Sequence, residues 1–236
     1  MRVAAISDIH GNLPALEAVL VDIERAGVDE IVVVGDVVSG PWPAEVFDLT
    51  AELGALVVRG NGDRLALSGG EGAIGDWSAR RLENRREAVA AWPLTLELNV
   101  EGLGSVLVCH ATPTSDELIY TRVTPDNELT QLLANVDADV VVCGHTHMQY
   151  DRTLASGLRI VNPGSVGMPY EGKRGAFWAL LGSDVEFRCT EYDVEAAVSA
   201  IRGSGAPDVE EQLVRFLLAP PDPDATTEYF ESLRAA

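Results

Sequence analysis

The sequence predicts an α/β fold. Over the first 60 residues, short apolar segments alternate with segments of helical period, a pattern typical of a largely parallel sheet covered on both faces. Four short apolar segments nearer the C-terminus, separated by turn residues, indicate a second and more antiparallel sheet. The proportions of 47% hydrophobic and 23% charged residues fit a globular chain.

The N-terminal quarter is predicted to alternate strand and helix. A strand at 2–6 leads into a polar loop, and Asn12 is a suitable N-cap for the helix that follows. Pro14 fits the first turn of this helix, and Gly27 ends it. The next elements in order are a strand at 31–34, a helix at 43–53 and a strand at 56–58.

The remainder of the chain continues both patterns. Residues 65–92 contain a glycine-rich stretch and then one charged helix, which we interpret as a helical insertion. Residues 193–236 read as a helical C-terminal extension with a break at 220–224. The expected elements between them are strands at 94–98, 105–109, 139–143, 149–154, 158–161, 176–181 and 185–189, and a helix at 127–135. Because no repeat or low-complexity linker interrupts the pattern, residues 1–236 are predicted to form a single domain.

The formal net charge of −20 disfavours binding to nucleic acid or to an acidic membrane, so neither partner is expected. The same charge would repel a phosphate ester unless bound cations reversed the field locally. No apolar run approaches the ~20 residues that cross a bilayer, and no signal peptide is evident, so we expect a cytoplasmic location. Cys109, Cys143 and Cys189 are too few for a disulfide scaffold and are expected to be buried.

Seven side chains of metal-binding type directly follow predicted strands. They are Asp8, His10, Asp36, Asn61, His110, His145 and His147, and they include all four histidines of the chain. Because the carboxyl ends of parallel strands gather at one edge of a sheet, these residues are expected to converge. Their mixture of oxygen and nitrogen ligands suits manganese, iron or zinc better than calcium.

Each of these residues also has an ordinary structural interpretation. A single histidine near a strand is more often structural than a ligand, Asp8 and Asp36 are plausible turn or capping residues, and Asn61 suits a left-handed turn between two glycines. The joint arrangement favours a metal site over these alternatives. Asp63 is interpreted as a helix cap or as the partner of a neighbouring arginine.

The order of the motifs resembles that of the calcineurin-like metallophosphoesterase superfamily. Its pattern of D-x-H, G-D, G-N, H and G-H-x-H is met here by Asp8-Ile9-His10, Gly35-Asp36, Gly60-Asn61, His110 and Gly144-His145-Thr146-His147. The opening Ser-Asp-Ile-His-Gly-Asn and the segment Asn162-Pro163-Gly164-Ser165 resemble its YfcE-like phosphodiesterase branch. The resemblance extends to about residue 189 and implies a four-layer α/β/β/α sandwich.

The resemblance also implies a centre of two divalent metal ions. Manganese is favoured, with iron, zinc, nickel and magnesium as alternatives. The first metal would be held by Asp8, His10 and His147, the second by Asn61, His110 and His145, and Asp36 would bridge the two. Asp36, Asn61 and His110 would then be catalytic, because they position a metal-bridging hydroxide and the phosphate for in-line attack.

One position departs from the family pattern. Many members have a histidine after the G-N pair, where this chain has Gly62. Its absence favours substrates with less basic leaving groups, or a proton supplied by metal-bound water. The chain also lacks the G-D-x-V-D-R-G signature of phosphoprotein phosphatases, so protein dephosphorylation is disfavoured.

These features predict a binuclear metal-dependent phosphoesterase, with a phosphodiesterase acting on a small phosphate ester favoured. The alternatives are a phosphomonoesterase, a nucleotide or dinucleoside polyphosphate phosphohydrolase, and a non-catalytic protein-interaction scaffold. Scaffold relatives, such as retromer subunits, tend to lose metal ligands, and the intact set here favours an enzyme. Homo-oligomerisation is left open, as are the physiological substrate and the native metal.

Overall fold

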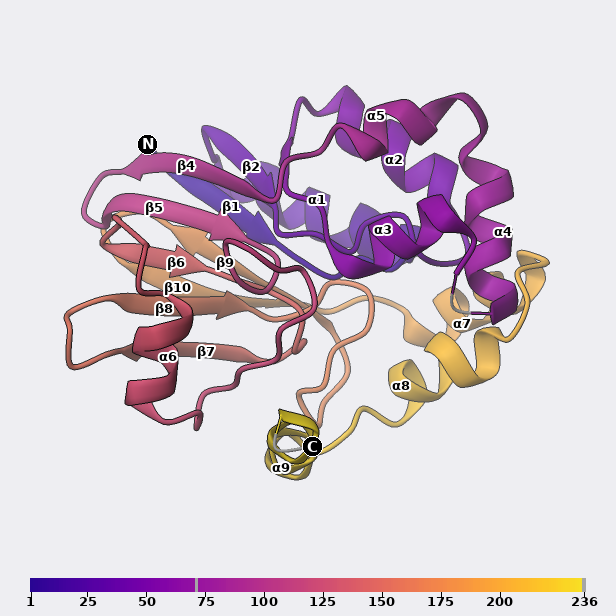
Figure 1. Cartoon of the computed structure of the whole chain (residues 1–236). Coiled ribbons are helices and arrows are strands. Elements are labelled where there is room, and N and C mark those ends of the chain that lie inside the picture. The colour runs from indigo at the N-terminus through magenta and orange to yellow at the C-terminus, as the bar shows by residue number, and fades with distance from the viewer. Residues whose placement is uncertain (71, 235–236) are drawn as a thin grey trace.

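The computed structural model describes residues 1–70 and 72–234, in which two five-stranded sheets pack face to face (Figure 1). The first sheet contains β1 (Val3–Ile6), β2 (Glu30–Val33), β3 (Leu56–Val57), β9 (Ala176–Leu181) and β10 (Val185–Thr190), in the order β10-β9-β1-β2-β3. β1, β2 and β3 pair in parallel, with Ala4 opposite Ile31, whereas β9 is antiparallel to both of its neighbours.

The second sheet has its parallel strands in the middle. It contains β4 (Thr95–Val100), β5 (Gly104–Cys109), β6 (Val140–Val142), β7 (Gln149–Thr153) and β8 (Arg159–Pro163), in the order β4-β5-β6-β8-β7. β5, β6 and β8 are parallel, and the edge strands β4 and β7 are antiparallel to their neighbours.

The expectation that the last four strands form a separate antiparallel sheet is wrong. β7 and β8 join the second sheet, but β9 and β10 return to the first, where β9 pairs with β1. Both sheets are therefore mixed. Apolar runs identify a strand in the sequence, but they do not identify a neighbour more than 150 residues away, as β1 is from β9.

Helices cover the outer faces of both sheets, which confirms the four-layer α/β/β/α sandwich. α1 (Leu13–Ala26) and α2 (Pro43–Glu52) pack on the first sheet, and α6 (Asp126–Leu132) packs on the second. The ends of α1 are as predicted, since the Asn12 side chain accepts a hydrogen bond from the Ala15 amide and Gly27 is left-handed. Between the sheets lies a valine-rich core that includes Val32, Val108 and Val142.

Residues 65–92 form several short helices where one was expected. They are the end of α3 (Asn61–Ser68), then α4 (Gly72–Leu82), the 3₁₀ turn η1 (Glu83–Arg85) and α5 (Arg86–Ala90). Glu83 has a φ of 46°, which interrupts the helical path between α4 and α5. α3 begins directly after the loop that follows β3, so this segment starts at the same sheet edge as the predicted ligands.

The C-terminal segment is helical, as predicted. It contains α7 (Val194–Gly203), the π-helical turn η2 (Glu210–Val214), α8 (Arg215–Leu218) and α9 (Pro223–Arg234). The predicted break is shorter than expected, because Pro223 already occupies the first turn of α9. Apolar residues of α7, η2 and α8 pack together with Ile74 of α4 (Figure 1). This contact fixes the C-terminal helices against the segment at 65–92.

Within the described ranges, no helix has the length and apolar character needed to cross a bilayer. Cys109 and Cys143 are buried, as expected, but Cys189 is exposed. Cys189 lies on β10, an edge strand whose burial pattern is largely open.

Candidate metal centre

The seven predicted ligands lie just beyond the C-terminal ends of five strands, six in loops and Asn61 at the start of α3. Asp8 and His10 follow β1, Asp36 follows β2, Asn61 follows β3, His110 follows β5, and His145 and His147 follow β6. These parallel strands come from both sheets, so the site lies where the two sheets end together. This is the convergence expected for the carboxyl ends of parallel strands.

Asp8, His10 and His147 form the first group, in which the ligand atoms all lie within 4.8 Å of one another. The His147 Nε2 lies 3.2 Å from Asp8 Oδ1 and 3.2 Å from the His10 Nε2. Asp8 is fully buried and His147 nearly so. Ring nitrogens and a carboxylate that converge in this way match the donor set of a divalent transition metal.

Asp36 links the first group to a second one. Its Oδ2 lies 3.7 Å from the His10 Nε2 and 3.5 Å from the His110 Nε2. Asp8, Asp36 and His110 again offer ligand atoms within 4.8 Å of one another. The Asn61 Oδ1 lies 3.0 Å from the same His110 nitrogen. A carboxylate between two clusters of donors has the position required of a ligand that bridges two ions.

His145 lies beside the second group without joining either set of close ligand atoms among the described residues. Its ring centroid is 5.1 Å from that of His110, and its backbone amide donates to the Asp8 carboxylate at 3.2 Å. Its Nε2 lies 3.2 Å from the Glu117 carbonyl. A proton on Nε2, donated to this carbonyl, leaves Nδ1 as the nitrogen that can bind a metal.

Backbone carbonyls orient two of the other histidines. The His110 Nδ1 lies 2.7 Å from the Val34 carbonyl, and the His147 Nδ1 lies 2.6 Å from the Met168 carbonyl. Donation from Nδ1–H sets the tautomer and directs each Nε2 lone pair into the cluster. Neither carbonyl could be identified from the sequence, because a backbone carbonyl group has no residue-specific signal.

The ligand loops are held in a rare backbone conformation. Of the seven non-glycine residues with positive φ in the described chain, five are predicted ligands: Asp8, His10, Asp36, His145 and His147. Such conformations cost of order 1–3 kcal/mol each and gather at functional sites. Hydrogen bonds between loops hold them here, including His10 N to the Asp36 carbonyl at 2.9 Å.

The Asn162–Ser165 segment fastens these loops together. The Asn162 side chain donates to the Gly144 carbonyl at 2.7 Å, and the Ser165 hydroxyl donates to the Asp8 carbonyl at 2.8 Å. Both side chains are fully buried. In the sequence this segment supported only a resemblance, and the structure gives it a positioning role.

Asp63 fixes the loop that carries Asp36. Its buried carboxylate accepts hydrogen bonds from four backbone amides at 2.8–3.0 Å, those of Asp36, Val37, Val38 and Gly60. Gly60 is the N-cap residue of α3, so the bond from its amide confirms the interpretation of Asp63 as a helix cap. The bonds to residues 36–38 are an additional role that the sequence did not indicate.

Gly62, which replaces the family histidine, lies against Asp36. Its amide donates to the Asp36 Oδ1 at 2.7 Å. A Cβ at this position would lie 3.0 Å from the same oxygen, closer than ordinary packing allows. A histidine here would therefore crowd the Asp36 carboxylate unless the loop moved.

Burial and charge set the protonation of the metal-free cluster. Burial lowers the pKa of His10 and of His145 to about 4, so both rings are neutral near pH 7. Burial opposes protonation of His110 as well, but the charge of Asp36 outweighs it and raises the pKa of His110 to about 10. His110 consequently carries a proton that a metal ion would have to displace in order to bind Nε2.

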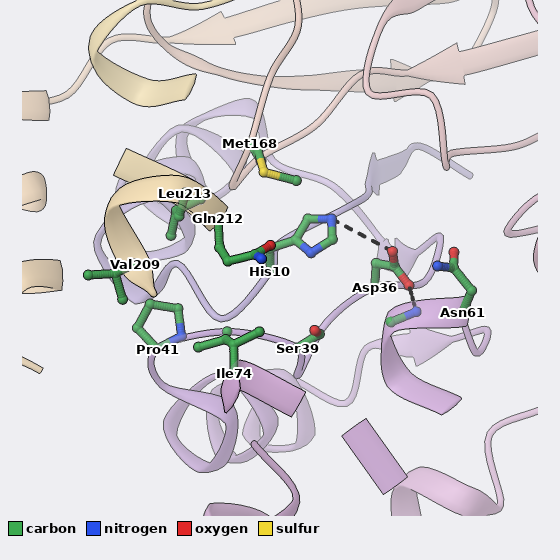
Figure 2. A pocket seen from close by; sticks show the side chains of 12 residues that line it. His10, Asp36, Ser39, Pro41, Asn61, Ile74, Met168, Val209, Gln212 and Leu213 are labelled. Atoms are coloured by element: carbon green, nitrogen blue, oxygen red, sulfur yellow. Dashed lines mark hydrogen bonds and ion pairs between the residues drawn. The ribbon is translucent and has the colours of Figure 1, made fainter. Parts of the chain in front are cut away.

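A pocket opens beside the cluster, with His10, Asp36 and Asn61 at one end (Figure 2). The other end is apolar and includes Ile74 of α4 and Leu213 of η2. The pocket volume is about 140 Å³. The candidate centre is therefore accessible to a small ligand.

Comparison with known proteins identifies the family. Residues 1–183 match the model of the calcineurin-like phosphoesterase superfamily domain, and the chain belongs to this superfamily. It is 30% identical to the uncharacterized protein MJ0912 of Methanocaldococcus jannaschii, over 87% of this chain and 94% of that protein. It is 28% identical to the phosphodiesterase YfcE of Escherichia coli, over 78% of this chain and 89% of that protein.

A solved structure shares the same architecture. The metallophosphoesterase from Sphaerobacter thermophilus is 27% identical and superposes with a TM-score of 0.74, over 93% of this chain and 99% of that one. The similarity thus extends well beyond residue 183 and includes much of the helical C-terminal segment.

We expect Asp63→Asn to loosen the centre without unfolding the protein. The substituted amide leaves two of the four backbone N–H groups facing an NH₂ group, which costs about 2–3 kcal/mol of the free energy of unfolding. Manganese affinity should fall about 10–100-fold, as is typical when a supporting group is lost. Chemical denaturation and titration calorimetry measure the two effects. Asp137→Asn, at an exposed position, is the matched control and should change neither.

Metal binding is expected to release protons. At pH 7.5 His110 is protonated in the metal-free protein, because its pKa of about 10 lies above the pH, and its Nε2 must lose the proton to coordinate. The apparent manganese affinity should therefore rise about tenfold per pH unit between pH 6 and 8 for each proton released. Burial of His147 is likewise outweighed by the charge of Asp8, which raises the pKa of His147, so a proton from His147 adds to this dependence. Calorimetry in buffers of different ionisation enthalpy counts the protons. An affinity independent of pH would show that His110 does not bind the metal.

Proposed function

We propose that the chain is a phosphodiesterase that hydrolyses a small phosphate ester with two divalent cations held by the cluster. The observation that carries this proposal is the position of the Asp36 carboxylate, within 3.7 Å of ring nitrogens from both ligand groups. The named activity of the relative YfcE supports the choice of a diester.

The proposed roles follow the two groups. Asp8, His10 and His147 would hold the first cation, Asn61, His110 and His145 the second, and Asp36 would bridge them. The close contacts within the first group and between Asp36, His110 and Asn61 support this assignment. His145 needs its Nδ1 for the metal, which the contact of its Nε2 with Glu117 allows.

When bound, the cations would lower the pKa of a water molecule and offset the charge that develops on the phosphoryl oxygens. The protein holds the side chains that would place these cations and the phosphate. Asp36 is held in place by the Gly62 amide, and Asp63 fixes the backbone on both sides of this contact. His110 is held by Val34, and its Nε2 faces Asn61. Asp36, Asn61 and His110 are therefore the residues that we assign to catalysis, through positioning of the attacking water and the phosphate.

The donor set fits a transition metal. Three carboxylate or amide oxygens and four imidazoles suit manganese and also iron, zinc or nickel, whereas magnesium prefers oxygen ligands alone. We propose manganese as the native ion. The expected cytoplasmic location and the single-domain organisation stay predictions, and homo-oligomerisation stays open.

The pocket beside the cluster weighs against nucleoside polyphosphates. Among the described residues that line it, none is a lysine or an arginine, which a polyphosphate chain would need. The scaffold alternative is weakened by the complete ligand set, because a scaffold has no need of buried carboxylates that converge on histidines.

Removal and return of metal tests the proposal. We expect chelated protein to be inactive, and manganese to restore hydrolysis of bis(p-nitrophenyl) phosphate more strongly than of p-nitrophenyl phosphate or of nucleotides. Asp36→Asn and His145→Ala should each lower kcat/KM at least about a thousandfold, since each removes a metal ligand, while the melting temperature stays within a few degrees. Asp137→Asn serves as the active control.

Full activity after chelation, or in either ligand variant, would refute the mechanism. A stable complex with a partner protein, together with no hydrolysis in the presence of manganese, iron, zinc, nickel or magnesium, would favour the scaffold function instead.

A further inference from the structure

The pocket beside the metal centre has two chemically different ends. His10, Asp36 and Asn61 lie at one end. The opposite wall is formed by apolar side chains, namely Pro41, Ile74, Val209 and Leu213, and the Met168 side chain lies beside His10, between the two ends (Figure 2). A molecule with its phosphoryl group at the polar end would therefore place its organic group against this apolar wall.

The wall is built by segments that pack on each other. Ile74 comes from α4, whereas Val209 and Leu213 come from the chain around η2, beyond the residues that match the family model. All three are buried and belong to one apolar cluster with residues of α7 and α8. The wall is thus part of a packed core, which makes it a preformed surface.

The turn that carries the wall is itself unusual. Leu213 and Gln212 lie on the π-helical η2, and single π turns occur frequently at functional sites. Gln212 is exposed and is directed into the pocket on the side of His10 (Figure 2). It offers one amide to a ligand.

Size and charge define what this wall can accept. The pocket volume of about 140 Å³ is close to the roughly 150 Å³ of an apolar cavity that binds benzene. The lining carries no basic side chain among the described residues, so a second charged group would be repelled or left unpaired.

We infer that the apolar wall is the site for one of the two organic groups of the phosphodiester, and that it selects an uncharged aromatic or branched apolar group at this position over a smaller or charged one. This inference rests on the proposed function, because the metal end must take the phosphoryl group. Val209 and Met168 are then residues that determine specificity.

Binding of two phosphonates to manganese-loaded protein distinguishes the contributions of the two ends of the pocket to affinity. Phenylphosphonate and methylphosphonate offer the same charged group to the metals and differ only in the organic group. Titration calorimetry should give at least about tenfold tighter binding of phenylphosphonate, from burial of the larger apolar surface. Val209→Thr, which replaces a methyl group by a hydroxyl, should reduce this ratio about threefold, and Met168→Gln should do the same.

Val21→Thr is the matched control, because it makes the same change at an exposed position of α1 outside this pocket. It should leave the ratio unchanged. Melting temperatures establish that each variant is folded, and methylphosphonate binding shows that its metal end is intact.

Equal binding of the two phosphonates, or a preference that both pocket variants retain, would overturn the assigned wall while leaving the metal centre in place. Failure of both phosphonates to bind would overturn the proposed function and this inference with it.

Discussion

Burial of the Asp8 and Asp36 carboxylates is the constraint on which the rest of the site depends. They are 0% and 3% exposed, and among the described residues their ion pairs are with histidines alone. A buried carboxylate costs several kcal/mol unless a positive charge compensates it. In the metal-free protein a proton on His110 supplies part of that charge. Divalent cations would supply more of it, so metal binding and the stability of this region are coupled.

The loops around the two buried carboxylates are held by hydrogen bonds, as this constraint requires. The ligand loops adopt left-handed backbone conformations, and the amides and carbonyls of neighbouring loops hold them there. Asp63 contributes a third buried carboxylate, which is satisfied by backbone amides in place of a cation. Burial and the charge of Asp36 raise the pKa of Asp63 to about 7, so this loop too is sensitive to the charge at the centre.

Much of this arrangement could be predicted from the sequence, because its signals are local. Asn12 and Gly27 mark the ends of α1, and apolar runs ending in Asp or His mark the strands that lead into the site. Their convergence follows from the rule for parallel strands. The pairing of β9 with β1 could not be predicted, since both are uniformly apolar and no nearby residue records the partner.

The parts of the site that are formed by backbone groups and by distant segments also could not be predicted from the sequence. The carbonyls of Val34 and Met168 orient two histidines, yet any residue could supply them. The pocket wall depends on packing between α4 and η2, which are more than 120 residues apart in the chain. This packing places an apolar surface beside a strongly polar centre. In the proposed function it would tie the choice of substrate to α4 and η2, which contain none of the seven predicted ligands.

Crystals grown with manganese would test the metal centre most directly, because anomalous scattering locates each ion. We expect two peaks per chain, both in contact with Asp36, one beside His10 and His147 and the other beside Asn61 and His110. A single peak, or manganese bound away from Asp36, would contradict the binuclear centre.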